Sequence, residues 1–524
     1  MSGITLDGES LTVDDVWAVA VEGASAVLGE QARQRVQACH EAVMRLVEAG
    51  EIAYGVTTGF GAFKKKLIRP EQTAALQVNL LRSHAAGVGP LADEPTVRAM
   101  LVVRANTLAK GYSGVRPQVI DTLLELLHKK VCPVVPAQGS LGASGDLAPL
   151  AHLALVLIGE GEAFYNGERL SGGEALRRAG IQPLTLLAKE GVALINGTAY
   201  MTALGALTTY RAENLVCAAD VAGAMSLEAL RGTPAAFDQR LIGVRPHPRA
   251  IDAAAHLRRV LQGSTYLRPQ DPTDIQDAYS LRCMPQVHGA VRDAVAYARW
   301  VLDIELNSAN DNPLVFLDEA GNAEIISGGN FHGAPVAMAM DYLAMALTDL
   351  GSISERRCAR LVDPAKHDGA LPLFLTEHGG LENGLMLAQY TAAALVSENK
   401  VLAHPAVVDN VSTSADVEDH VSMGATATRQ AYEVLVNTET VIALELLCAA
   451  QGIDFRRQAL PAEARMGRGT APAYHAVREA VPFLEHDREL APDIERVRQM
   501  ISDGSLMAAV RAALGVGEGE SNCG

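Results

Sequence analysis

The chain has 524 residues, of which 49% are hydrophobic and 4% aromatic, and its formal net charge is −17. This hydrophobic content is enough for a large core and excludes a disordered chain. The negative charge argues against nucleic acid and against an anionic membrane surface as partners, because both would be repelled.

The cysteines and the first residues bear on the cellular compartment. Seven cysteines are scattered without a CxxC pair, so we predict free thiols and no metal site of the zinc type. The opening MSGITLDGES lacks the basic and apolar regions of a secretory signal, and we identify no apolar run of membrane-spanning length. We therefore expect a cytoplasmic protein with no membrane partner.

Apolar residues recur at helical spacing along most of the chain, with glycine-bearing loops between the helical stretches. In chain order we predict helices over residues 14–50, 71–86, 94–109, 116–130, 147–160, 198–230, 277–306, 331–360, 381–403 and 416–452. The scarcity of aromatic residues favours close helix packing over a β-sandwich. We predict a mainly all-α fold, an elongated helical bundle whose exposed apolar faces are buried by oligomerisation.

No proline-, serine- or glycine-rich linker divides the chain, so we predict one intimately packed unit. Within it, residues 1–200 form a loop-rich N-terminal domain, and residues 201–524 form the central long-helix bundle and the C-terminal helices. We expect the polar, glycine-rich loops to gather at one end of the bundle and to hold the active site.

The stretch GSLGASGDLAPLAHLALVLIGEG, residues 139–161, begins as a loop of small residues and continues into an apolar helix. If the Gly145 nitrogen attacked the Ala143 carbonyl, a five-membered ring would close, and glycine favours this because it has no Cβ. Loss of water from the ring and from the Ser144 side chain would leave a methylene conjugated to a carbonyl, which is a strong electrophile. The structural alternative is an ordinary helix-entry loop with Asp146 near the helix N-terminus.

The same stretch resembles the prosthetic-group loop of the histidine, phenylalanine and tyrosine ammonia-lyase family, whose members form 4-methylideneimidazol-5-one (MIO) from Ala-Ser-Gly. The resemblance continues through YGVTTGFG (54–61), NLLRSHAAGVGP (79–90), LINGT (194–198), QDAYSLRCMPQVHGAVRD (276–293), IELNSANDNPLVF (304–316), SGGNFHG (327–333) and EDHVSMG (418–424). It implies a mainly helical homotetramer whose active sites are shared between subunits. Different chains would contribute Tyr54, the Ala-Ser-Gly loop and Glu418 to each site. It implies no metal and no external cofactor.

The reaction that this resemblance implies is loss of ammonia from an aromatic L-α-amino acid, giving a trans-2,3-unsaturated acid. The β-hydrogen that leaves is scarcely acidic, so an electron sink is needed, and MIO made from Ala143, Ser144 and Gly145 would supply it by covalent catalysis. Tyr54, on a loop with Gly55 and further glycines, is expected to be the base.

The resemblance assigns further residues to the substrate. Arg282 is expected to hold the substrate carboxylate in a two-pronged geometry, with Asn312 as a second contact. Gln276, Tyr279 and Arg282 follow one another at helical spacing, so we expect one helix face to present all three.

Three more residues take roles from the same resemblance. Asn196 resembles a group that, like Tyr279, steadies the prosthetic ring and the reacting atoms. Phe331 resembles the aromatic residue that packs near the methylidene, whereas we expect His332, which follows it, to be structural.

Two positions bear on the choice of substrate. His84 follows Ser83 in RSHAAG, and this pair resembles histidine ammonia-lyases, whereas phenylalanine enzymes have apolar residues there. Glu418 also resembles histidine enzymes, because a carboxylate can pair with an imidazole or act on its proton. Both residues favour L-histidine as the substrate and trans-urocanate as the product.

Three departures from the histidine enzymes leave alternatives open. Asp416 and Val417 replace the usual Asn-Gln, Ala199 replaces a Gln after NGT, and TTGFG stands where NTGFG is more common. The alternatives are a tyrosine or phenylalanine ammonia-lyase, or an aromatic 2,3-aminomutase that adds the ammonia back at the β-carbon. A more remote alternative is an inactive relative that serves as a scaffold.

Overall fold

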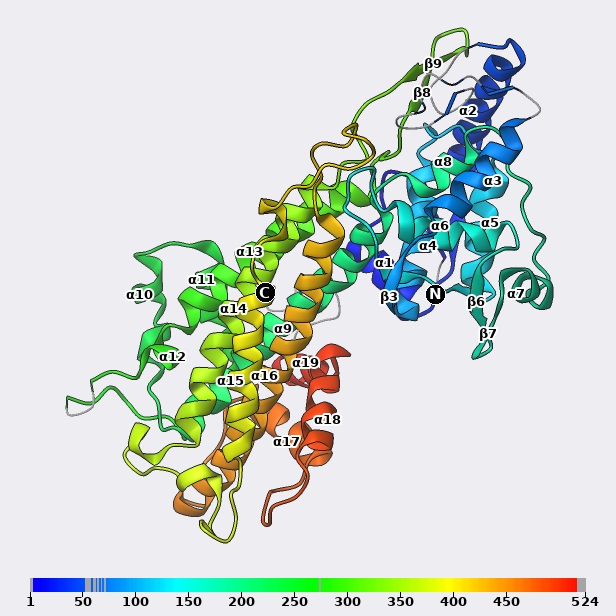
Figure 1. The fold of residues 1–524 in the computed structure, drawn as a ribbon. Coiled ribbons are helices and arrows are strands. Elements are labelled where there is room, and N and C mark those ends of the chain that lie inside the picture. Colours follow the sequence, from blue (N-terminus) through cyan, green and yellow to red (C-terminus); the bar gives the residue numbers. More distant parts are fainter. Residues whose placement is uncertain are drawn as a thin grey trace. The chain divides into compact units, whose positions relative to one another are not determined.

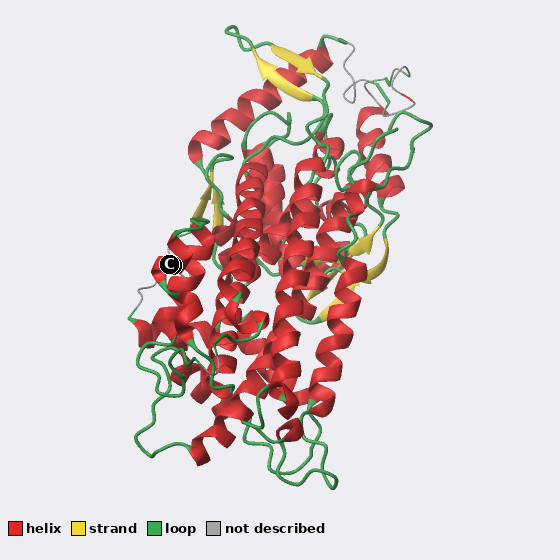
Figure 2. Cartoon of the chain, turned by 90° about the vertical axis from the view of Figure 1, so that its left-hand side faces the viewer, coloured by secondary structure: helices red, strands yellow, loops and turns green. Residues whose placement is uncertain are grey.

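The computed structural model describes residues 3–51, 58–59, 63, 66, 68–69, 72–272 and 275–515. Helices dominate (Figure 2), so the prediction of a mainly α-helical fold is confirmed. The helices, labelled where there is room in Figure 1, are α1 (Val13–Ala20), α2 (Glu30–Glu48), α3 (Thr73–His84), α4 (Glu94–Ala109), α5 (Pro117–His128), α6 (Leu147–Leu157), α7 (Gly172–Ala179), α8 (Glu190–Ile195), α9 (Ala199–Ala229), α10 (Gln239–Gly243), α11 (Pro248–Val260), α12 (Tyr279–Arg282), α13 (Met284–Leu306), α14 (Ala334–Leu361), α15 (Met386–Leu402), α16 (Gly424–Ala459), α17 (Thr470–Ala480), α18 (Ala491–Ser502) and α19 (Ser505–Leu514).

The strands are short and form small separate sheets. β1 (Ile4–Leu6) and β2 (Ala26–Leu28) pair in parallel, and β3 (Val88–Leu91) and β5 (Pro136–Gln138) pair antiparallel. β6 (Glu162–Tyr165) lies between β4 (Cys132–Pro133) and β7 (Glu168–Ser171), and β8 (Leu314–Leu317) forms a hairpin with β9 (Ala323–Ile326). None was predicted, because runs of two to four residues give no usable alternation of apolar and polar positions.

The chain divides into two compact units. Unit 1 contains Met1–Tyr210, Ala298–Asp341 and Pro405–Arg429, and unit 2 contains Arg211–Tyr297, Tyr342–His404 and Gln430–Gly524. The helices α9, α13, α14 and α16 each have residues in both units. The division therefore differs from the single boundary that we expected at residue 200.

Buried ion pairs join the long helices of unit 2. Arg211 on α9 pairs with Glu439 on α16 at 2.6 Å, and Arg357 on α14 pairs with Glu445 on α16 at 2.5 Å. Glu445 also accepts hydrogen bonds of 2.6 Å from the hydroxyls of Ser226 and Ser354. A buried charge is costly unless it is paired and hydrogen-bonded, so these contacts fix which helix faces meet.

Left-handed residues shorten or interrupt two of the predicted helices. The stretch 14–50 is interrupted after α1, where Gly23 takes a left-handed conformation (φ +78°) and β2 follows. The helix predicted from residue 416 begins at Gly424, because Asp416 and Met423, the residue directly before the helix, have positive φ. The segment that carries Glu418 is thus a loop.

The free-thiol expectation needs one correction, and one helix bears on the expectation about membranes. Cys217 is bonded in a disulfide, whereas the free thiols are Cys39, Cys132, Cys283, Cys358 and Cys448. Among the described helices, α14 alone is long and apolar enough to cross a membrane by length and composition. However, 61% of its most apolar window is buried inside the protein, as in a core helix.

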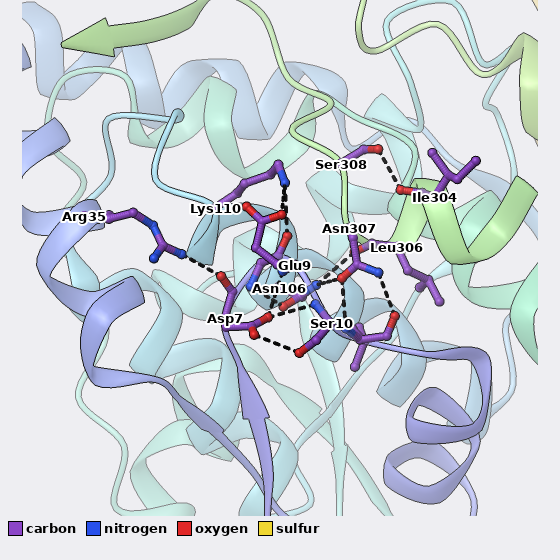
Figure 3. A network of polar contacts seen from close by, with 12 residues as sticks. Asp7, Glu9, Ser10, Arg35, Asn106, Lys110, Ile304, Leu306, Asn307 and Ser308 are labelled. Atoms are coloured by element: carbon purple, nitrogen blue, oxygen red, sulfur yellow. Dashed lines mark hydrogen bonds and ion pairs between the residues drawn. The ribbon is translucent and has the colours of Figure 1, made fainter. Parts of the chain in front are cut away.

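A network of polar contacts ties the N-terminal segment to unit 1 (Figure 3). The Asn106 side chain accepts a hydrogen bond from the Gly8 nitrogen and donates one to the Leu306 carbonyl, both at 2.9 Å. The Asn307 amide group accepts from the Leu11 nitrogen at 2.9 Å and donates to the Leu11 carbonyl at 2.8 Å. These side chains satisfy backbone groups of the N-terminal segment and the last carbonyl of α13, which holds the segment against α4 and the end of α13.

Candidate active site

The Ala-Ser-Gly loop lies between β5 and the start of α6 in unit 1. Ala143 is buried and packs with Val421 and Met423. Gly145 has a φ of +74°, and a Cβ at this position would overlap the carbonyl oxygen of Gly197. Glycine is therefore required at position 145 both for the backbone conformation and for the close approach of the other loop.

The LINGT segment is hydrogen-bonded to this loop through its backbone and one side chain. Gly145 and Gly197 form a parallel bridge, in which the Asp146 nitrogen donates to the Gly197 carbonyl at 2.7 Å. The Ser144 carbonyl accepts from the side-chain nitrogen of Asn196 at 2.8 Å and from the Gly197 nitrogen at 3.4 Å. The Ser144 carbonyl oxygen therefore faces two N–H donors.

Glu418 lies on the other side of the tripeptide. The Ser144 hydroxyl donates a hydrogen bond of 3.0 Å to Glu418 Oε1. The Met423 nitrogen donates to the Leu141 carbonyl at 2.8 Å, which holds the two loops together. Ser144 and Glu418 are thus joined within one chain, which corrects the expectation that this pair comes from different chains.

His84 ends helix α3 and is half-buried. Its Nδ1 lies 2.8 Å from the Leu80 carbonyl, so Nδ1 carries the proton and the neutral ring keeps Nε2 as an acceptor. Burial lowers the pKa of His84, and the nearby charge of Glu418 partly opposes this shift. The structure thus brings an imidazole into the field of the carboxylate beside Ser144.

Asn312 and Phe331 lie on two segments that meet at the β8–β9 hairpin. Asn312 Oδ1 accepts a hydrogen bond of 2.7 Å from the Gly328 nitrogen, which connects the DNP turn to the SGGNFHG loop. Phe331 is half-buried in that loop. His332 Nε2 lies 3.2 Å from the His420 carbonyl, and the two rings stack 5.7 Å apart, which agrees with a structural role.

Tyr279, Arg282 and Gln276 belong to unit 2. The Tyr279 ring is 71% exposed, and the Arg282 guanidinium lies 4.5 Å from its centroid in a cation–π contact. Gln276 precedes the helix, because Ala278 is extended at its N-cap (φ −61°, ψ 157°). The predicted continuous helix is also wrong at Cys283, since Pro285 has no N–H to continue the hydrogen-bond ladder. One helix face therefore does not present all three residues.

The structure brings together, in unit 1, most of the predicted site residues of that unit. Those in mutual contact are Ala143, Ser144, Gly145, Asn196 and Glu418, with His84 in electrostatic reach of Glu418. Tyr54, the predicted base, lies outside the described residues.

Sequence reasoning did not find the role of Asp146. The side chain is fully buried and accepts 2.9 Å hydrogen bonds from the Met201 nitrogen and the Ser140 hydroxyl. It therefore caps the start of α9 and makes no side-chain cap on its own helix α6. Burial raises the pKa of Asp146 to about 7. An acidic residue before an apolar helix was the only signal, and it suggested the wrong helix.

A family model for aromatic amino acid lyases matches residues 11–479 of the chain. The chain is 58% identical over 509 residues to a histidine ammonia-lyase of Chloroflexus aurantiacus, covering 97% of each sequence. It is 53% identical over 506 residues to a histidine ammonia-lyase of Caldanaerobacter subterraneus subsp. tengcongensis, covering 97% of this chain and 98% of the relative.

Two solved structures have the same fold. The histidine ammonia-lyase of Trypanosoma cruzi has a TM-score of 0.90 at 42% identity, covering 100% of this chain and 97% of the other. The tyrosine aminomutase of Streptomyces globisporus has a TM-score of 0.92 at 40% identity, covering 98% and 99%. The chain belongs to the aromatic amino acid lyase family, and the predicted resemblance is confirmed.

The buried carboxyl of Asp146 predicts a pH-dependent stability. Because its folded-state pKa is raised to about 7 from an ordinary 3.8, its stabilising contribution is complete below about pH 4 and is lost as the pH rises towards 7. We expect Asp146→Asn to remove this loss of stability. Between about pH 4 and pH 7, the free energy of unfolding of the variant should therefore rise relative to that of the wild type by up to about 4 kcal/mol. Chemical unfolding at several pH values measures the difference.

The control for this prediction is Ser140→Ala, which removes one hydrogen bond to Asp146 without removing the titrating group. Because this hydrogen bond lowers the pKa of Asp146, the stability of Ser140→Ala should stay pH-dependent, at least as strongly as that of the wild type. Parallel pH profiles for the wild type and Asp146→Asn would contradict the prediction.

Proposed function

We propose that this protein is a histidine ammonia-lyase, which converts L-histidine into trans-urocanate and ammonia. The observation that carries the proposal is the carboxylate of Glu418, bonded to the Ser144 hydroxyl at 3.0 Å and within the electrostatic reach of His84. A carboxylate and an imidazole acceptor suit a substrate ring that carries N–H groups, whereas a benzyl ring offers neither a proton nor a charge. The identity of 58% to a named histidine ammonia-lyase supports the same choice.

We infer that Ala143-Ser144-Gly145 forms MIO. The residues around the tripeptide fit this group, because the left-handed Gly145 leaves no space for a Cβ and the Ser144 carbonyl already has donors aimed at it. When formed, the group supplies an electrophile that draws electrons from the bound amino acid. The proposed chemistry requires no metal and no external cofactor.

The chain's own residues then have separate tasks. Asn196 donates to the Ser144 carbonyl and would stabilise negative charge there. Glu418 would pair with the substrate imidazole, while His84 Nε2 would accept its second ring proton. Tyr54 remains our proposal for the base that removes the β-hydrogen.

The remaining proposed roles concern the two ends of the substrate. Arg282 and Asn312 would hold the carboxylate, and Tyr279 and Gln276 would orient the amine and the reacting atoms. Phe331 would pack near the methylidene. We further propose a cytoplasmic homotetramer with active sites shared between subunits.

A tyrosine 2,3-aminomutase is the second candidate, because such an enzyme has the same fold at 40% identity and the chain departs from histidine enzymes at Val417. Val417 is 47% exposed, and Asp416 beside it accepts a hydrogen bond of 2.5 Å from the Ser412 hydroxyl. On the loop that carries Glu418, the Val417 side chain is therefore exposed and the Asp416 side chain is hydrogen-bonded within the loop.

The first test is a comparison of substrates. We expect purified protein to form urocanate from L-histidine and little product from L-tyrosine or L-phenylalanine, because Glu418 and His84 recognise ring N–H groups. Ultraviolet absorbance and chromatography of the products measure this. Coumarate, cinnamate or a β-amino acid as the main product would overturn the proposal.

The second test concerns the prosthetic group. Closure of the ring and dehydration remove two molecules of water, so the wild-type chain should be lighter than its translated sequence by that mass. Ser144→Ala should lose both the mass deficit and turnover, whereas Ser308→Ala, whose hydroxyl bonds the carbonyl of Ile304 at 2.8 Å, should retain both. Intact-mass spectrometry measures this. A wild-type mass equal to that of the translated sequence would show that no such group forms.

The third test separates charge from hydrogen bonding at Glu418. Glu418→Gln keeps the length of the side chain and an oxygen that can accept a hydrogen bond but removes the negative charge, so kcat/KM for L-histidine should fall by about a hundredfold or more. The exposed neighbour Asp419, changed to Asn, is the matched control and should leave kcat/KM unchanged. Equal kcat/KM values for Glu418→Gln and the wild type would exclude Glu418 from substrate recognition.

A further inference from the structure

Arg104 on α4 is a buried cation to which the proposed reaction gives no task. Its side chain is fully buried, and it donates hydrogen bonds to the Ala193 carbonyl and, at 3.4 Å, to Asn310 Oδ1. Burial lowers the pKa of Arg104 to about 10, and its Nε has no hydrogen-bond partner among the described residues. Burial of an unpaired guanidinium costs free energy, so its position needs a structural explanation.

The reason lies at the end of α8, which ends at Ile195 beside α6 in unit 1 (Figure 1). If the helix continued, the Gly197 nitrogen would donate to the Ala193 carbonyl, four residues earlier. Arg104 occupies that carbonyl instead. The Gly197 nitrogen turns away and donates to the Ser144 carbonyl at 3.4 Å.

The space around Gly197 agrees with this arrangement. Gly197 has a φ of +135°, and a Cβ there would overlap Asn310 Oδ1 and come within 2.6 Å of the Arg104 guanidinium. Asn310 also donates to the Thr198 hydroxyl at 2.8 Å, so it holds the residue on the far side of Gly197. Arg104 and Asn310 together fix the peptide that faces the tripeptide.

The Gly197 nitrogen donates its hydrogen bond to the Ser144 carbonyl oxygen. This oxygen would be part of the proposed prosthetic group. On ring closure, a bond would form between the Gly145 nitrogen and the Ala143 carbonyl carbon. The Ala143 oxygen would leave as water with the protons of the Gly145 and Ser144 nitrogens, and the Ala143 carbon would become doubly bonded to the Ser144 nitrogen. The Ser144 hydroxyl leaves with the Cα proton as a second water. The Ser144 carbonyl is retained, conjugated to the new methylene, and its oxygen gains negative charge when a nucleophile adds to that methylene.

We propose that Arg104 is a positioning residue that caps the Ala193 carbonyl and thereby directs the Gly197 N–H onto the Ser144 carbonyl oxygen. This inference rests on the proposed MIO group. It makes Gly197 N the second donor, beside Asn196, to an oxygen that becomes more negative during the reaction. Arg104 acts through Gly197 and does not itself touch the tripeptide.

The chain offers a matched control on the same helix. Arg98 donates to the carbonyls of Val19 at 2.7 Å and Ala20 at 3.0 Å, so it caps the end of α1 as Arg104 caps α8. Changing either arginine to methionine removes hydrogen bonds to carbonyl groups at the end of a helix. Arg104→Met alone removes the capping group next to Gly197.

The test measures electrophile reactivity without turnover. Full-length wild type, Arg104→Met, Arg104→Lys and Arg98→Met are exposed to borohydride, and the rate of mass gain by reduction of the methylene is followed. We expect Arg104→Met to react about tenfold more slowly than the wild type, Arg104→Lys to recover part of the rate, and Arg98→Met to match the wild type.

The outcomes distinguish this proposal from the proposed function. A wild type without the mass deficit of two waters contradicts both. Variants of Arg104 that carry the full deficit and react at the wild-type rate overturn only the role of Arg104. If Arg104→Met does not fold, Arg104→Lys decides: a several-fold slower reaction supports the proposal, and an unchanged rate overturns it.

Discussion

The close approach of two backbone segments, at Gly145 and Gly197, is the constraint on which the rest of the site depends. The Asp146 nitrogen and the Gly197 carbonyl are 2.7 Å apart, and no side chain fits between the two glycines. Asn196 adds a side-chain hydrogen bond across the contact, and Ala143 anchors the other segment by packing against Val421 and Met423. Because the contact leaves no room for a Cβ, it accounts for glycine as the third residue of Ala-Ser-Gly.

Helix termini supply the pieces of the site, because their unpaired backbone groups must find partners. The end of α8 yields Gly197 and is completed by Arg104, and the start of α9 is completed by Asp146. Each of these side chains reaches a helix other than its own. The buried polar groups near the tripeptide are thus the caps of helices that converge on it, which explains why a largely apolar core contains fully buried charges at this place.

The helices that needed only local information were predicted well. α4, α5 and α9 lie within two residues of the predicted bounds, since their periodicity and their proline or glycine limits are visible in the sequence. The loop of Glu418 was predicted as helix, because its left-handed residues Ser414 to Asp416 are not glycines and give no signal. Arg104 and Asp146 were missed for a different reason: their partners are carbonyl and N–H groups of helices far away in the chain, and no spacing rule encodes such contacts.

Family motifs therefore point to the residues that we propose to react, while the structure adds how they are held. The pairing of Glu418 with Ser144 illustrates the difference. The motif alone placed these two residues in different subunits, but the bond between the Met423 nitrogen and the Leu141 carbonyl brings their loops together in one chain. The segment that carries Glu418 is thereby held beside the tripeptide by a backbone hydrogen bond. In the proposed function, a carboxylate at this place favours a substrate ring that carries N–H groups.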